Sequence, residues 1–177
     1  MSVFFVGGIH GSGKSTLCRQ LSVPLQADHL IASELIEFTP DPHDLTRKGV
    51  VNVAQNQDRL LRALSQRKHV RPNVLLDGHF SVFDRTGRIV RIPVSVFREI
   101  NPAALLLVEA EPSKVRARLG RRDRRTYDLD LLTRLTSEER FHARDVSREL
   151  GIPLRIWRVG NGIDEAVRFL LAASRTS

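Results

Sequence analysis

The sequence predicts an α/β fold in three layers, with a parallel sheet of five strands between two layers of helices. Two observations carry this prediction. Short apolar runs rich in Val, Leu, Ile and Phe recur along the chain, and stretches with apolar residues at helical spacing separate them. Because consecutive parallel strands need crossovers, which are normally helical and right-handed, this alternation indicates a parallel sheet covered on both faces.

Each predicted strand is short and almost wholly apolar, as expected for a strand buried on both faces. The strands are expected at residues 2–6, 29–32, 74–76, 105–108 and 154–159. The helices are expected at residues 14–21, 34–36, 50–66, 94–100, 113–119, 129–150 and 164–173. Ser33 fits an N-cap, and Gly151 fits the C-terminal cap of the longest helix. Loops are expected at residues 38–48, 78–93 and 120–128.

The length of 177 residues suits one domain over residues 1–177 with a sizeable core. Cys18 is the only cysteine, so no internal disulfide can form and a reducing compartment is expected. The first residues lack the basic leader of a signal peptide, and no apolar run approaches the roughly 18–20 residues that span a bilayer. The sequence therefore predicts a cytoplasmic protein that has no membrane segment.

The formal net charge of +8 is unusually positive. Excess arginine attracts polyanions, which include nucleic acids, anionic membranes and phosphorylated metabolites. The arginines concentrate in residues 85–98 and 116–125 and do not form a basic tail. Such local clusters favour a phosphate-lined cleft, with nucleic acid as the second choice of partner.

Residues 8–15 read Gly-Ile-His-Gly-Ser-Gly-Lys-Ser and satisfy the P-loop pattern G-x-x-x-x-G-K-[ST], between a predicted strand and a predicted helix. The glycines allow a nest of inward-facing backbone N–H groups, and the helix N-terminus adds a positive dipole. Lys14 is expected to reach the β- and γ-phosphates of ATP, and the Ser15 hydroxyl to ligate Mg²⁺. The predicted ATP contacts in this segment are Gly8, His10, Gly11, Ser12, Gly13, Lys14, Ser15 and Thr16. His10 lies at the rim of the loop, where it could touch a phosphate or be a tolerated substitution.

Asp77 ends the apolar run 74–76, and ligands of α/β sheets bind at the carboxyl ends of the strands. We therefore expect Asp77 to hold Mg²⁺, directly or through water, as an acidic Walker B residue does. The alternative is a solvated aspartate that begins an Asp-Gly turn. His79 could contact a bound phosphate or nucleotide on the acceptor side, or cap the loop.

Five arginines near Gly120 predict a lid that closes over a polyphosphate. Guanidinium groups bind phosphate oxygens bidentately and stabilise charge that develops on a transferred phosphoryl group. They are Arg118, Arg121, Arg122, Arg124 and Arg125, in a lid over about residues 118–128, and a solvated basic helix end is the alternative. Arg47 and Arg88 are candidates for binding the acceptor, for which residues 33–70 form the expected region.

The Gly-Ser-Gly-Lys-Ser-Thr loop and three later segments resemble the archaeal-type adenylate kinases, within the P-loop nucleoside monophosphate kinases. VLLDGHFSVFDRTGRIVRIPVSVFREINP (74–102) is similar to that family's strand, Asp-x-His element and Asn-Pro turn. LLLVEAEPSKVRARLGRRDRRTYD (105–128) is similar to its fourth strand and arginine-bearing lid. ELGIPLRIWRVGNGIDEAVRFLL (149–171) is similar to its closing strand and helix.

The resemblance implies the P-loop NTPase fold with a five-stranded parallel sheet, ATP and Mg²⁺ as donor and cofactor, and phosphoryl transfer to AMP. It implies that Arg47 contacts the acceptor's phosphate and that the turn at Gly160 and Asn161 lies near the donor adenine. It also implies a homo-oligomer, since members of that family assemble as trimers. The sequence departs from the family at His10, where proline is more common, and over residues 28–56, which should shape the acceptor pocket.

Three functions remain open on the sequence. The first is an AMP kinase. The second is a P-loop kinase for a hydroxyl metabolite, for which Asp77 is a conceivable general base. The third is a P-loop ATPase that binds RNA or a ribonucleoprotein through its positive surface.

Overall fold

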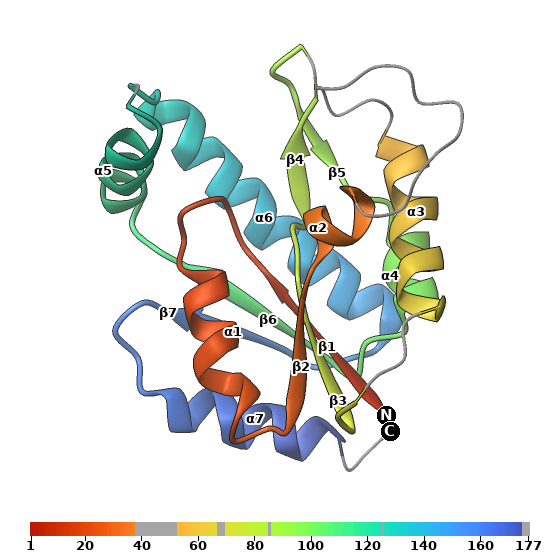
Figure 1. Cartoon of the computed structure of the whole chain (residues 1–177). Helices are drawn as coiled ribbons and strands as arrows, with labels where there is room; N and C mark the ends of the chain where they lie inside the picture. The colour runs from red at the N-terminus through yellow and green to blue at the C-terminus, as the bar shows by residue number, and fades with distance from the viewer. Residues whose placement is uncertain (38–52, 67–69, 85, 125, 175–177) are drawn as a thin grey trace.

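A parallel sheet of five strands forms the centre of the computed structural model, which describes residues 1–37, 53–66, 70–84, 86–124 and 126–174 (Figure 1). The strand order is β2-β3-β1-β6-β7, and every neighbouring pair in this sheet is parallel. The strands are β1 (Ser2–Gly7), β2 (Ala27–Ile31), β3 (Asn73–Asp77), β6 (Ala104–Glu109) and β7 (Leu154–Arg158). The predicted α/β fold with a five-stranded parallel sheet is confirmed.

Helices cover both faces of this sheet. One face carries α1 (Lys14–Ser22) and α7 (Ile163–Ser174), whose apolar residues pack with Phe4 and Val6 of β1. The opposite face carries α2 (Ala32–Glu37), α3 (Val53–Gln66), α4 (Val94–Ile100) and α6 (Leu129–Leu150). Phe5 of β1 points to that second face, where its ring meets Phe80 and Phe97 at centroid distances of 5.0 Å.

The alternation of side chains along β1 explains why the whole strand is apolar. Phe4 and Val6 enter one core and Phe5 the other, and all three are at most 2% exposed. A strand in this position has no solvent face on which a polar residue would be stable. The middle of the sheet is therefore rigid, and it sets the position of the loop that follows Gly7.

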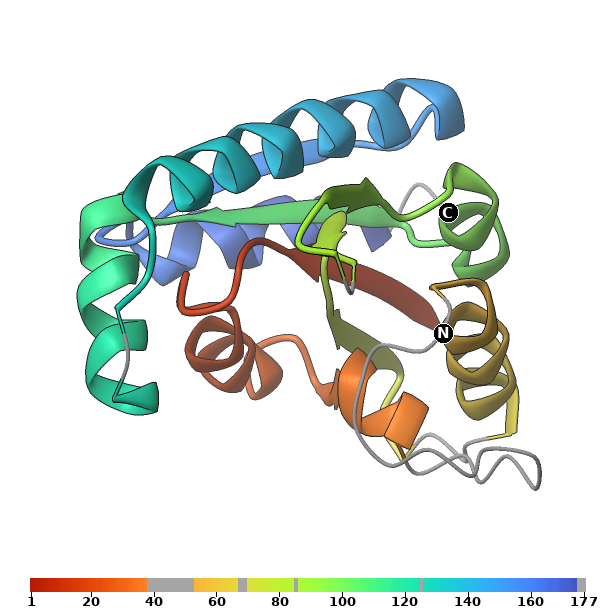
Figure 2. The same cartoon turned by 90° about the horizontal axis from the view of Figure 1, so that it is seen from above.

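The parallel register brings three strand ends to one edge. Val6 of β1 pairs with Asp77 of β3, and Gly7 pairs with Leu107 of β6. Residues 8–13 leave the sheet at this edge and lead directly into α1. Figure 2 shows α6 running along the sheet and α5 (Pro112–Asp123) standing beyond this edge.

Three local predictions need correction. Ser33, expected as an N-cap, is the second residue of α2, which begins at Ala32. The expected loop at 78–93 contains an antiparallel hairpin of β4 (Ser81–Phe83) and β5 (Ile89–Arg91). The sequence did not reveal it because each strand has only three residues, of which two are apolar. The helix expected to end at residue 119 continues to Asp123, so Arg121 and Arg122 lie on a helix. Basic residues in a last helical turn stabilise it through the helix dipole, which offsets part of the cost of Gly120.

Within the described ranges, none of the helices has the length and apolar character needed to cross a membrane.

Candidate active site

The loop from Gly8 to Gly13 joins the central strand to α1. Gly8 has a φ of 143°, and a Cβ on it would lie 2.5 Å from the backbone oxygen of Val108. Only glycine allows the loop to pass so close to the neighbouring strand β6. Gly13, with a φ of 104°, is the N-cap of α1, so the free N–H groups of that helix face the loop.

Donor side chains hold the carbonyl oxygens of this loop. Lys14 Nζ donates to the Ile9 oxygen at 3.0 Å, and Arg118 Nη1 on α5 donates to the Gly11 oxygen at 3.0 Å. Lys14 is only 6% exposed, and burial lowers its pKa although Asp77 and Glu139 oppose the shift. The loop thus carries a cation at its centre and a second at its rim, an arrangement suited to a polyphosphate.

Ser15 and Asp77 form the polar centre at the start of α1. Ser15 Oγ donates to Asp77 Oδ2 at 2.6 Å, and Lys14 Nζ lies 4.0 Å from Asp77 Oδ1. Burial by itself would raise the pKa of Asp77, but His29, Lys14 and Ser15 together hold that pKa below its usual value. The buried carboxyl group is therefore an anion at neutral pH.

The residues at this centre fit a magnesium ion. Mg²⁺ prefers hard oxygen ligands, which Ser15 and Asp77 provide. A second group, Cys18, His29 and Asp77, has its possible ligand atoms within 4.8 Å of one another. Burial raises the pKa of the Cys18 thiol far above neutrality, whereas a metal requires the thiolate. The oxygen pair is thus the better ligand set, and His29 Nε2 lies 3.5 Å from Asp77 Oδ2.

The structure brings together two histidines that the sequence placed on either side of the nucleotide. The rings of His10 and His79 lie with centroids 4.2 Å apart and planes at 52°. Burial lowers the pKa of His79 to about 3, and desolvation together with the neighbouring His79 and Lys14 also lowers the pKa of the more exposed His10. Both rings are therefore neutral at pH 7 and can offer directed hydrogen bonds without adding charge.

Glu139 is a buried residue of this site that the sequence reasoning missed. It lies on α6, its Oε2 accepts the Phe80 N–H at 2.9 Å, and its Oε1 is 3.4 Å from His79 Nδ1. Burial raises the pKa of Glu139 to about 7. The overlooked signal is its position on the apolar face of the helix, four residues after Leu135 and seven before Val146.

A second carboxylate that sequence reasoning missed ends strand β6. Glu109 is 7% exposed, and Arg140 on α6 donates to its Oε1 at 2.5 Å. Arg158 Nε lies 3.7 Å from the other oxygen. This network ties α6 and β7 to the strand that borders the loop, and its members are too far apart in sequence to form a motif.

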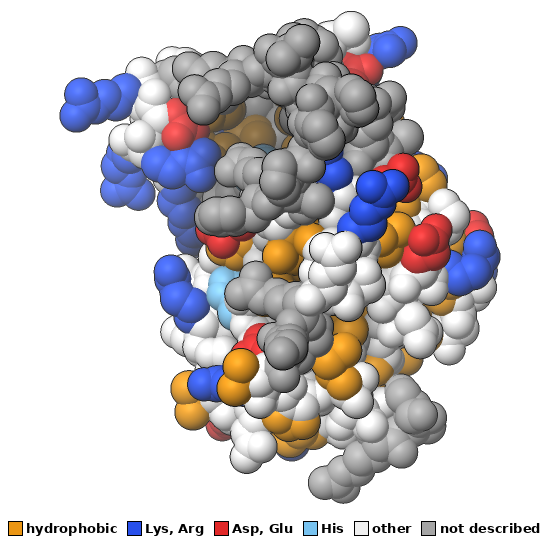
Figure 3. Space-filling view, turned by 45° about the vertical axis from the view of Figure 1, so that its right-hand side comes forward, with side chains coloured by type: hydrophobic (Ala, Val, Ile, Leu, Met, Phe, Trp, Pro, Cys, Tyr) orange, Lys and Arg blue, Asp and Glu red, His pale blue; other side chains and the backbone are white. Residues whose placement is uncertain are grey.

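The lid arginines do not act alike in this structure. Arg118 reaches the loop, whereas Arg121, Arg122 and Arg124 are exposed. Arg122 donates to the neighbouring Asp123 at 2.6 Å. Figure 3 shows Lys and Arg side chains gathered at the upper left of one face. Arg125 lies outside the described residues.

The remaining predicted contacts are placed as follows. Arg88 is in the β4–β5 turn, exposed, and bonded to Asp84. Asn161 N–H donates to the Arg158 oxygen at 2.9 Å in the turn after β7, and Gly160 has a φ of 112°. That turn adjoins the loop, since Val159 lies near Gly13. Thr16 is exposed, Ser12 is fully buried, and Arg47 lies outside the described residues.

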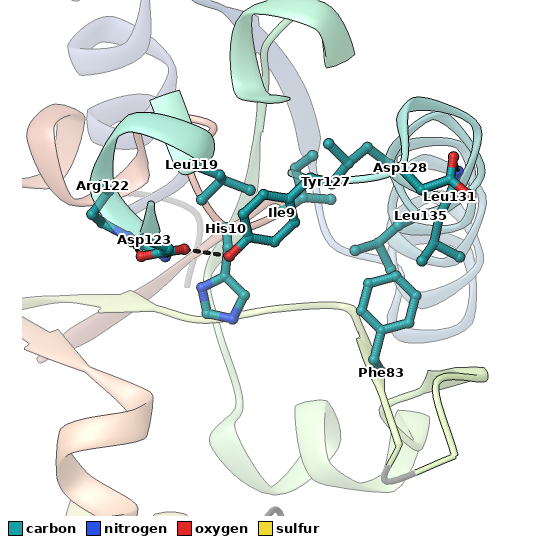
Figure 4. Close-up of a pocket in the computed structure, with 11 residues that line it drawn as sticks. Ile9, His10, Phe83, Leu119, Arg122, Asp123, Tyr127, Asp128, Leu131 and Leu135 are labelled. Carbon is teal, nitrogen blue, oxygen red and sulfur yellow. Dashed lines mark hydrogen bonds and ion pairs between the residues drawn. The ribbon is translucent and has the colours of Figure 1, made fainter. Parts of the chain in front are cut away.

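A cavity of about 550 Å³ adjoins the start of the loop (Figure 4). Ile9 and His10 line it from the loop, and Leu119 and Leu135 line it from α5 and α6. Tyr127 projects between them and donates its hydroxyl hydrogen to Asp123. The apolar side chains here belong to a small core that joins the loop to the lid helix.

Comparisons with known proteins agree with this geometry. A protein-family model described as an AAA domain matches residues 7–135, which include the loop, Asp77 and α5. An adenylate kinase from Pyrococcus abyssi (strain GE5 / Orsay) is 26% identical over 159 residues, covering 85% of this chain and 78% of that protein.

Two solved structures share the fold. A gluconokinase from Sinorhizobium meliloti 1021 has a TM-score of 0.58 at 15% identity, covering 99% of this chain and 93% of that one. A shikimate kinase from Acinetobacter baumannii, in complex with shikimate, has a TM-score of 0.57 at 16% identity, with the same coverage. At these identities the likeness shows a shared architecture.

Proposed function

The chain belongs to the AAA domain family and is a P-loop protein similar to nucleoside monophosphate kinases, and from this premise we propose that it transfers the γ-phosphoryl group of ATP to AMP. The observation that carries the proposal is the meeting of Lys14, Ser15 and Asp77 at the start of α1. A cation, a hydroxyl and a carboxylate at a helix N-terminus are the groups needed to hold a magnesium triphosphate.

The donor side of the reaction uses the loop. Its N–H groups would bind the phosphates, and Lys14 would move from the Ile9 oxygen to the β- and γ-phosphates. Ser15 and Asp77 would hold Mg²⁺, which neutralises phosphate charge when bound. The turn at Gly160 and Asn161 would lie beside the adenine, and Thr16 and Ser12 would contact the phosphates at the end of the loop.

The state of Asp77 favours an acceptor that brings its own nucleophile. Its lowered pKa, the hydrogen bond from Ser15 and the nearby His29 make it a poor general base. A hydroxyl metabolite would need such a base, whereas the phosphate oxygen of AMP is already a nucleophile. The adenylate kinase relative supports AMP as the first acceptor to test.

The acceptor and lid residues complete the proposal. Arg47, His79 and Arg88 would bind the acceptor, in a region of about residues 33–70 within the single domain. Arg118 would stabilise the transferred group with Arg121, Arg122, Arg124 and Arg125, in a lid of about residues 118–128. A cytoplasmic location and a homo-oligomer remain predictions.

The test is transfer from ATP labelled at the γ-phosphate. AMP, other nucleoside monophosphates, small alcohols and RNA with a free 5′ end are offered separately. We expect the label to appear in the ADP formed from AMP, and each ATP and each AMP consumed to yield one ADP. Label in an alcohol instead would move the assignment to a metabolite kinase, and phosphate release with every acceptor would indicate an ATPase.

A further inference from the structure

Glu139 is a buried carboxyl group for which the proposed transfer reaction has no direct use. Glu139 is only 1% exposed, and its Oε2 accepts the Phe80 N–H at 2.9 Å. Its Oε1 has no hydrogen-bond partner among the described residues. A buried acceptor left in this state costs about 1–3 kcal/mol, so a carboxyl group here is expensive unless it has a task.

The polar atom that faces Oε1 is His79 Nδ1, at 3.4 Å. The His79 ring in turn lies against His10, at a centroid distance of 4.2 Å. These three side chains form a line from the interior of α6 to the start of the phosphate-binding loop. A triphosphate bound in this loop would run from α1 back toward Gly8, so the end near His10 would be the end nearer the γ-phosphate.

We propose that Glu139 is a positioning residue for phosphoryl transfer, and that it fixes the His79 ring beside His10 at the start of the phosphate-binding loop. This rests on the proposed transfer from ATP. A neutral imidazole contributes a directed N–H donor or an acceptor nitrogen, and the strength of the hydrogen bond that it makes depends on the orientation of the ring. Without Glu139 the 3.4 Å contact at Nδ1 is gone and the ring can turn about χ2, whereas the loop amides and Lys14 still hold ATP.

A purely structural role would leave a different trace. If Glu139 serves only as the acceptor for the Phe80 N–H, its Oε2 atom is sufficient. Removal of the Glu139 side chain then lowers the free energy of unfolding but has no effect through His79. If Glu139 acts through His79, removal of either residue removes the same contribution to catalysis. The two losses then fail to add in a double variant.

The test compares Glu139→Ala, His79→Ala and the double variant with Glu139→Gln. The glutamine amide keeps an acceptor for Phe80 and offers an N–H to His79 Nδ1. We expect kcat for transfer to AMP to fall about 10- to 100-fold in each alanine variant, with KM for ATP within about twofold. The double variant should be no slower than the slower single one, and Glu139→Gln should stay within about threefold of wild type.

Glu138→Ala is the matched control, since Glu138 is the preceding residue and binds Arg91 on the outer face of α6. It should leave kcat unchanged. Should Glu139→Ala fail to fold, Glu139→Met takes its place, because it fills a similar volume without polar atoms. Losses that multiply in the double variant would overturn the proposal, as would a lower unfolding midpoint with unchanged kcat.

A measurement without any acceptor separates this inference from the proposed function. At pH 6, where a protonated Glu139 can donate to Nδ1 as the glutamine amide does, the ¹⁵N shifts of the His79 ring should show the Nε2–H tautomer in wild type and in Glu139→Gln, and an average of two in Glu139→Ala. A wild-type chain that leaves AMP unphosphorylated but shows this pattern would refute AMP as acceptor and support the positioning role. Identical ring spectra in wild type and Glu139→Ala would refute the positioning role, whatever the acceptor.

Discussion

Ser15 Oγ lies 2.6 Å from Asp77 Oδ2, although the two residues are 62 positions apart in the sequence. The parallel pairing of β1 with β3 produces this contact, because Val6 and Asp77 are in register and the loop returns to the sheet edge at Ser15. The hydroxyl and the carboxylate thus lie together before any ligand binds. Lys14, 4.0 Å from the other carboxylate oxygen, balances the charge.

Replacement of Asp77 by asparagine should abolish most magnesium-dependent transfer. The amide keeps the size of the side chain but loses the negative charge, so the divalent cation binds more weakly. We expect kcat to fall at least about 100-fold, with partial recovery at high Mg²⁺. Asp164→Asn, at an exposed position on α7, is the control and should be neutral. Equal activity of Asp77→Asn and wild type at limiting Mg²⁺ would contradict the assignment of the metal site.

Lys14→Met should separate catalysis from folding. Loss of the cation at the loop should lower kcat by about 10²–10³-fold, the usual cost of removing one group that stabilises transition-state charge. The fold should survive with a lower free energy of unfolding, because the buried Asp77 carboxylate loses the neighbouring cation that balances its charge.

Turnover and urea unfolding measure the two effects of Lys14→Met side by side. Lys114→Met, at an exposed lysine on α5, should alter neither. A folded Lys14→Met chain with wild-type turnover would refute the role of Lys14.

Gly8→Ala should damage the loop by steric contact. Its Cβ would meet the Val108 oxygen at 2.5 Å, in a backbone conformation that L-residues rarely adopt. We expect about 3 kcal/mol of destabilisation and loss of ATP binding. Gly87→Ala shares a positive φ of 78° but meets no atom within 4 Å, so it should cost only about 1 kcal/mol and leave ATP binding intact. Thermal unfolding and calorimetric titration with ATP measure both, and equal effects of the two changes would exclude the steric explanation.

The sequence was sufficient for the sheet and for the loop because both rest on local signals. Apolar runs mark the strands, and Gly8 to Ser15 form one contiguous pattern whose context follows from the neighbouring elements. Glu139 and His29 could not be assigned in this way. Glu139 contacts His79 and Phe80, and His29 contacts Asp77. These partners are about 50 to 60 positions away in the sequence, and only the folded chain brings them together. The hairpin at 81–91 was missed because its strands are shorter than a recognisable period.

Glu139 should also make the stability of the folded chain depend on pH. Burial raises its pKa from 4.5 to about 7, so between these values the folded state binds a proton that the unfolded state has lost. The contribution of Glu139 to the free energy of unfolding is therefore fully present below about pH 4.5 and is lost as the pH rises through about 7. At about 1.4 kcal/mol per pH unit the loss is on the order of 3 kcal/mol.

Urea unfolding of wild type and Glu139→Gln at a series of pH values from 4.5 to 8 isolates this effect. His10 and His79, whose pKa values are lowered to about 3, act in the opposite direction, since their contribution is lost as the pH falls below about 6.5. Burial causes most of that contribution and is common to both chains, so the difference between them reports Glu139 together with its weaker coupling to His10. The free energy of unfolding of Glu139→Gln should rise relative to that of wild type up to about pH 7, and the difference should then stay constant. A difference that does not change with pH would show that the Glu139 carboxyl group ionises as readily in the folded chain as in the unfolded one.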